Sequence, residues 1–101
     1  MQQQQGDVTL EMAKVPKNAK KLNHLTLAEG ETTGHAHRIT GGDGVATLFE
    51  EKGNLYLSVV GGSVTLTHEE HTAQTIPAGE YRVGRVLEYD YDTEEAKAVR
   101  D

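Results

Sequence analysis

The sequence predicts an all-β fold: a small single domain in which about seven or eight short antiparallel strands form a barrel, a roll or a sandwich. Three observations lead to this prediction. Apolar and polar residues alternate along most of the chain, turns that contain glycine recur roughly every eight to twelve residues, and no segment has the periodicity of a long helix. With 101 residues the chain is long enough for one domain, which we assign to residues 1–101 with a glutamine-rich N-terminal segment at 1–6.

Each strand is predicted from its own alternation and from the turn that ends it. The clearest case is residues 63–67, where Val64 and Leu66 are expected to point inward and a polar tip follows. Gly84 lies inside the longest strand candidate, residues 81–91, and we expect a β-bulge there. Residues 93–99 are expected to form one short helical turn, and the alternative is that residues 99–101 return as a short strand. The remaining strand candidates are residues 8–13, 24–29, 35–39, 45–50, 55–60 and 72–76.

Composition excludes several classes of protein. The chain contains no cysteine, which excludes disulfides, thiolate metal sites and cysteine nucleophiles. The formal net charge of −6 argues against a nucleic-acid partner, and we interpret the lysines at 14, 17, 20 and 21 as a solvated loop. No apolar run is long enough to cross a membrane, and the N-terminus lacks the pattern of a secretory signal. We therefore expect a cytoplasmic protein with no membrane partner, in the host cytoplasm if the gene is phage-encoded.

Four of the five histidines fall in two short motifs, and this clustering is the main functional signal. His35 and His37 are two residues apart, so an extended strand places both imidazoles on one face, close enough to bind one divalent ion. His68 and His71 flank a polar hairpin tip and add ligands if the fold brings that tip beside the first pair. Zinc, iron, manganese or nickel suits such a site. The alternative is that these histidines hydrogen-bond to neighbouring strands or form a recognition surface.

Arg82 and Arg85 form a second candidate ligand site. Two guanidinium groups beside Tyr81 can clamp a carboxylate or a phosphate, which points to an anionic ligand. Ion pairs with Glu88 or Asp90 are the alternative. We assign no catalytic residue, because the sequence has neither a nucleophile elbow nor a phosphate-binding glycine loop with its lysine.

Motifs along nearly the whole chain resemble a small family of uncharacterised phage and bacterial proteins. The pattern consists of QGDV at 5–8, TGHAH at 33–37, THEEH at 67–71, IPAGEYRV at 76–83 and EYD at 88–90. More loosely, Gly30, His35, His37, Pro77 and Gly79 are similar to the glycine, HxH and PxG elements of metal cupins, although no histidine follows shortly after Gly79. The cupin resemblance implies a small β-barrel or roll and a metal-dependent enzyme with histidine ligands.

Together these observations favour a non-enzymatic binding protein that recognises a small molecule, an anion or a partner protein through its histidine-rich loops. A cupin-like enzyme that depends on a divalent metal is one alternative, and a structural or assembly protein is the other. The chain has one Phe and no Trp, so its core is expected to be modest. A modest core gains stability when copies of the chain share it, and we therefore expect a homo-oligomer.

Overall fold

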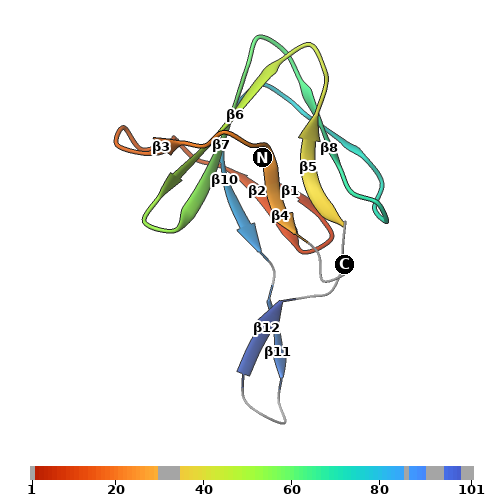
Figure 1. Cartoon of the computed structure of the whole chain (residues 1–101). Coiled ribbons are helices and arrows are strands. Elements are labelled where there is room, and N and C mark those ends of the chain that lie inside the picture. The colour runs from red at the N-terminus through yellow and green to blue at the C-terminus, as the bar shows by residue number, and fades with distance from the viewer. Residues whose placement is uncertain (1, 30–34, 86, 91–94, 99–101) are drawn as a thin grey trace.

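The computed structural model describes residues 2–29, 35–85, 87–90 and 95–98, and every regular element within them is a β-strand (Figure 1). Ten strands form two antiparallel sheets, one of six strands and one of four, and two further strands form a separate hairpin. Neither sheet closes on itself, so the arrangement is a two-sheet sandwich and not a barrel. The predicted all-β class is confirmed, and the chain has more strands than we expected.

The order of strands in each sheet follows antiparallel pairing throughout. The larger sheet contains, from one edge to the other, β1 (Gln2–Gln5), β2 (Val8–Met12), β10 (Gly79–Arg85), β7 (Asn54–Val60), β6 (Val45–Glu51) and β3 (Lys20–Lys21). The smaller sheet contains β4 (Thr26–Glu29), β5 (Ala36–Thr40), β8 (Val64–Thr67) and β9 (Gln74–Ile76). The hairpin of β11 (Leu87–Asp90) and β12 (Glu95–Ala98) lies apart from both sheets in Figure 1.

The core lies between the two sheets, where the inward-facing residues of both meet. Val64 and Leu66 of β8 are buried, as their alternation predicted. Tyr81 also faces inward, and its hydroxyl donates to the Pro77 carbonyl at 2.6 Å, so its polar atom is satisfied. Burial raises the pKa of the Tyr81 hydroxyl. The other core residues come from both sheets and are Val8, Leu10, Leu27, Ile39, Leu48, Leu57, Val59 and Ile76.

Two glycine-rich connections cross between the sheets side by side. Residues 41–44 join β5 to β6, and residues 61–63 join β7 to β8. The backbone N–H of Gly44 donates to the Ser63 carbonyl at 2.8 Å, which ties the two connections together. A Cβ on Gly44 would lie 2.5 Å from the carbonyl oxygen of Gly62, so this close approach requires glycine.

The structure corrects the expectation of a bulge at Gly84. Gly84 pairs regularly with Thr9 of β2, within a register that continues from Met12 to Val8. Glycine is favoured here because a Cβ at this position would lie 2.7 Å from Thr9 Oγ1, so it allows the close approach of Thr9.

The strand expected over residues 81–91 is divided between β10, which ends at Arg85, and β11. Residues 95–98 form β12, antiparallel to β11, so the expected helical turn is wrong there. The alternative, a short strand at residues 99–101, lies outside the described residues. Residues 86, 91–94 and 99 lie outside the described residues. The glutamine-rich start forms β1, which pairs with β2.

The described residues include no helix of the length and apolar character needed to cross a membrane.

Candidate functional site

A cluster of histidines lies where β5 and β8 end side by side. The two strands pair with Arg38 opposite Thr67, so His37 and His68 occupy the next positions along them. The alternation that turns Ile39 into the core turns His37 inward as well, and His37 is 0% exposed while His68 is 7% exposed. The centroids of these two imidazole rings are 4.4 Å apart. The antiparallel register therefore joins two motifs that are distant in the sequence.

The other two motif histidines complete this group. His71 stacks on His37 with 5.8 Å between ring centroids, and its ring lies 4.7 Å from that of His68. His35 meets His68 edge to face at 5.7 Å. We call His35, His37, His68 and His71 the histidine cluster. The structure thus brings together the four histidines that the sequence singled out, whereas the exposed His24 lies in another part of the chain.

Gln5 of β1 fixes the orientation of His37. Its amide nitrogen donates to the carbonyls of Leu66 at 3.0 Å and Thr72 at 2.9 Å, so its amide oxygen is the atom that faces the ring. That oxygen lies 2.9 Å from His37 Nδ1 and can only accept a hydrogen bond. His37 therefore carries a proton on Nδ1, and its Nε2 faces the carboxylate of Asp7.

Asp7, in the turn between β1 and β2, is a buried carboxylate beside the cluster. Its side chain is 0% exposed, and its Oδ1 lies 3.4 Å from His37 Nε2. Arg85 of β10 reaches it from the surface: Nε donates to Oδ2 at 2.8 Å, and Nη2 bonds the same oxygen. A carboxylate is costly to bury without a cationic partner. The guanidinium of Arg85 therefore accounts for the burial of Asp7.

Glu69 lies on the exposed side of the cluster and has a strongly lowered pKa. Its Oε1 accepts the backbone N–H of Ala36 at 2.8 Å, and its Oε2 accepts Arg38 Nη1 at 2.9 Å. The bond from Ala36, followed by those from Glu69's own amide and from Arg38, lowers the pKa of the carboxyl from 4.5 to about 2. Glu69 is therefore ionised near neutral pH, and it ties the 68–71 tip to β5.

Three groups that can ligate a metal converge beside this tip. The ligand atoms of His35, His68 and Glu69 all lie within 4.8 Å of one another. The backbone N–H of Glu70 donates to His68 Nδ1 at 3.0 Å, so that nitrogen is an acceptor and a neutral His68 carries its proton on Nε2. His35 Nδ1 lies 3.5 Å from Glu70 Oε2. The site therefore combines neutral nitrogen donors with carboxylate oxygens.

The two arginines that the sequence predicted as a clamp have different partners. Arg82 is exposed on the outer face of β10, where its Nη2 lies 3.5 Å from Asn54 Oδ1. Arg85, whose side chain is 44% exposed, binds Asp7, a partner that we did not predict. Both arginines line one pocket of about 270 Å³, whose other lining residues are Thr9, Glu11 and Gly84.

Gln5, Asp7 and Glu69 are site residues that were not predicted as such. Nothing local distinguishes Gln5 from the glutamines before it, and an aspartate in a turn is ordinarily exposed. Glu69 carried a usable signal, because it lies between two candidate histidine ligands. Asp7 and Gln5 become recognisable only once β1, β2 and β5 are placed together.

Residues 4–86 match the model of a family described as Domain of unknown function (DUF8820). The matched segment contains the whole histidine cluster together with Asp7 and Arg85, and it ends before the β11–β12 hairpin. Neither the curated proteins nor the solved structures gave a match.

Proposed function

We propose that this chain, which belongs to the DUF8820 family, binds a divalent metal ion through the histidine cluster. The observation that carries the proposal is the convergence of imidazoles from two separate segments, with ring centroids between 4.4 Å and 5.8 Å apart. Neutral imidazole is the commonest protein ligand for transition metals, so a bound ion gives this arrangement a use.

His35, His68 and Glu69 are the proposed ligands, because their ligand atoms already lie within 4.8 Å of one another. Bonds of about 2.0–2.1 Å place neighbouring ligands of a tetrahedral ion about 3.4 Å apart, so modest side-chain rotations close the site. His37 and His71 are the adjacent imidazoles from which a fourth ligand can come. Mixed nitrogen and oxygen donors suit zinc, iron, manganese or nickel.

The ionised state of Glu69 favours this role. Its pKa of about 2 means that the carboxylate needs no deprotonation before it binds a cation. Protons then compete with the metal only at the imidazoles. We therefore expect metal affinity to fall as the solution is acidified below neutral pH.

Metal binding requires a change at His68. Its Nδ1 accepts the Glu70 amide, and the proton of the neutral ring occupies Nε2. An ion can bind this ring only if the ring turns over or if Nδ1 releases the amide. Loading with metal is therefore expected to shift the backbone amide resonance of Glu70.

A bound ion also supports recognition of a small anionic ligand at this site. Three protein ligands leave coordination positions on the ion open, and an anion can occupy them. Arg38 is paired with Glu69 and Arg85 with Asp7. The two guanidinium groups therefore offset the negative charge of the two carboxylates near the cluster. We assign no reaction. The cupin-like metal enzyme is the alternative, favoured by the HxH spacing of the first histidine motif.

Calorimetric titration of metal-free protein with zinc, nickel or manganese tests the proposal. We expect about one ion per chain, and an affinity loss of about a hundredfold or more in His35→Ala and in His68→Ala, because each removes a ligand. His24→Ala is the matched control, since this exposed histidine lies outside the cluster and only its Nδ1 contact with the Thr26 amide, at 3.2 Å, is removed.

Absence of saturable binding in the wild type contradicts the proposal, and so does equal binding in His35→Ala, His68→Ala and the control. Circular dichroism of each variant shows whether the fold is retained. If metal-free protein binds a small anion, and the cluster variants lose that binding, the histidines form a recognition site without a metal.

A further inference from the structure

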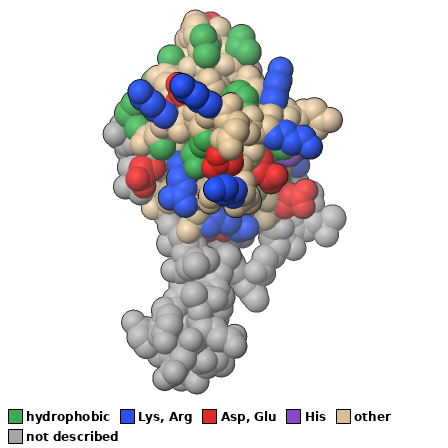
Figure 2. All heavy atoms as spheres, turned by 90° about the vertical axis from the view of Figure 1, so that its left-hand side faces the viewer, with side chains coloured by type: hydrophobic (Ala, Val, Ile, Leu, Met, Phe, Trp, Pro, Cys, Tyr) green, Lys and Arg blue, Asp and Glu red, His purple; other side chains and the backbone are tan. Residues whose placement is uncertain are grey.

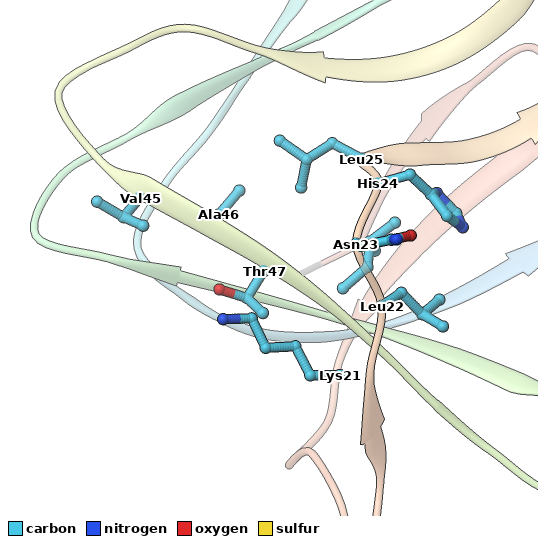
Figure 3. Close-up of a pocket in the computed structure, with 9 residues that line it drawn as sticks. Lys21, Leu22, Asn23, His24, Leu25, Val45, Ala46 and Thr47 are labelled. Atoms are coloured by element: carbon cyan, nitrogen blue, oxygen red, sulfur yellow. The ribbon is translucent and has the colours of Figure 1, made fainter.

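An apolar groove of about 270 Å³ lies at the edge of the larger sheet, and none of its lining residues belongs to the histidine cluster (Figure 3). Figure 3 shows Leu25 on one side of the groove and Val45 and Ala46 of β6 on the other. Lys21 lies beside Thr47 at its lower side. The groove forms where the chain leaves β3 and crosses to β4.

The backbone of β6 is open along this groove. β3 pairs with two residues of β6, Phe49 and Glu50, and the backbone N–H of Leu22 donates to the Leu48 carbonyl at 2.8 Å. These bonds cover the C-terminal half of β6 and stop at Leu48. The N–H and C=O of one strand residue point to the same side, and those of its neighbours point to the other. Leu48 directs its N–H and C=O toward the β3 side of β6. Ala46, two residues earlier, directs its N–H and C=O to the same side, where they face the groove. Within the described residues no strand pairs with residues 45–47 on this side.

Large apolar side chains are exposed around the open edge. Val45 is 69% exposed, and its cross-strand partner Val60 is 63% exposed. Leu25 is 37% exposed on the opposite wall. Apolar surface left in water costs roughly 25 cal/mol per Å², and contiguous exposed apolar residues are typical of binding surfaces.

The residues that line the groove include one cationic side chain, Lys21, and no carboxylate, although the chain as a whole is acidic. The net charge of the protein is −6, yet Lys21 lines the groove and the neighbouring Lys20 is exposed. Figure 2, which faces the β3 side of the molecule, shows Lys and Arg side chains on this face with Asp and Glu side chains among them, and Glu50 lies opposite Lys20 in the pairing of β3 with β6. Lys14 and Lys17 belong to the exposed segment that leads into β3. The lining of the groove itself therefore complements an acidic ligand.

We propose that the open edge of β6 binds an extended, acidic peptide segment of a partner protein as an added antiparallel strand. Ala46 exchanges two backbone hydrogen bonds with the segment. Alternate apolar side chains of the segment enter the groove between Leu25 and Ala46, and the carboxylates between them point to the other face of the sheet, which carries Lys21. A second copy of this edge fits less well, because it presents the same lysines and like charges oppose each other across the contact.

Fluorescence anisotropy with a labelled synthetic peptide of alternating valine and aspartate tests the proposal. A peptide with lysine in place of aspartate is the control, and we expect it to bind the wild type at least about tenfold more weakly. Lys21→Glu should reverse this preference. Ala46→Pro removes the groove-facing N–H while the ladder with β7 is kept, because proline is tolerated where the N–H of an edge strand faces outward. We expect this variant to bind the aspartate peptide at least about tenfold more weakly.

Several outcomes overturn the proposal: no saturable binding to the wild type, equal affinity for both peptides, or undiminished binding by Ala46→Pro. If circular dichroism shows that Ala46→Pro does not fold, the peptide preference of Lys21→Glu decides the test, and an unchanged preference in that variant overturns the proposal. A dimer in sedimentation that Ala46→Pro disrupts, and that excludes the peptide, shows that a second copy is the occupant and also overturns it. Binding to His35→Ala should equal that of the wild type, which separates this surface from the metal site.

Discussion

The histidine cluster and the groove at β6 place polar and apolar side chains in opposite ways. Asp7 and His37 are fully buried at the cluster, whereas Val45 is 69% exposed at the groove. Both arrangements cost folding free energy. At the cluster the chain supplies the compensation itself through Gln5 and Arg85, but at the groove the apolar side chains remain in contact with water. This difference is the basis for proposing a small ligand at the cluster and a macromolecular partner at the groove.

The largest expected effect on stability comes from Asp7→Asn. The substitution keeps the shape of the side chain but leaves the guanidinium of Arg85 without its carboxylate. Removing one member of a buried pair costs about 3–5 kcal/mol, and we expect about 2 kcal/mol because Arg85 is 44% exposed and can be rehydrated. Urea unfolding measures the change. Glu11→Gln, on the exposed side of β2, is the control and should change stability by less than about 0.5 kcal/mol.

Gln5→Ala tests whether the chain itself organises the cluster. The substitution leaves the carbonyls of Leu66 and Thr72 and the Nδ1 of His37 without the bonds that Gln5 makes. We expect a loss of about 1–1.5 kcal/mol in unfolding free energy, at the lower end of the penalty for unsatisfied buried polar groups. Gln4→Ala, one residue earlier and exposed, should be close to neutral. Equal effects at the two glutamines would show that Gln5 is not a structural part of the site.

The pH dependence of stability separates Glu69 from the other carboxylates. Its pKa in the folded state, about 2, lies below its ordinary value of 4.5. Its contribution is therefore fully present above about pH 4.5 and is lost as the pH falls through about 2. We expect the wild type to be more stable than Glu69→Gln near neutral pH, and the difference to shrink over this window. A difference in urea midpoint that stays constant down to about pH 2 would contradict the assignment.

The smallest expected effect is that of Val45→Thr. The side chain lies largely in water, so its replacement should change the unfolding free energy by less than about 0.5 kcal/mol. The same change makes the groove wall more polar and should weaken binding of the aspartate peptide. A stability loss comparable to that of Asp7→Asn would mean that Val45 is part of the core and would remove the contrast between the two regions.

Local pattern predicted the elements whose pairing follows from alternation. The inward positions Val64 and Leu66 and the all-β class are confirmed, because a period of two on a strand decides which face is buried. The two histidine motifs were also visible as patterns. Their proximity was not, since it depends on the β5–β8 register that places Arg38 opposite Thr67.

What the sequence does not reveal depends on contacts between distant segments. Gln5 differs from Gln4 only because it reaches Leu66 and Thr72, more than sixty positions away. Arg85 pairs with Asp7, which lies 78 positions earlier in the sequence. No local signal distinguishes this carboxylate from the other acidic residues. The expected bulge at Gly84 is wrong for the same reason, because the requirement for glycine comes from contact with Thr9 on another strand.

Native mass spectrometry combined with elemental analysis, on untagged protein purified without chelator, tests the central claim most directly. We predict about one divalent ion for each chain in the wild type and in His24→Ala, and loss of that ion in His35→Ala and His68→Ala. The same spectra report how many copies of the chain associate, which tests the expected homo-oligomer. A wild-type protein that carries no metal, and that takes up none when zinc is added, would contradict the claim that the histidine cluster is a metal site.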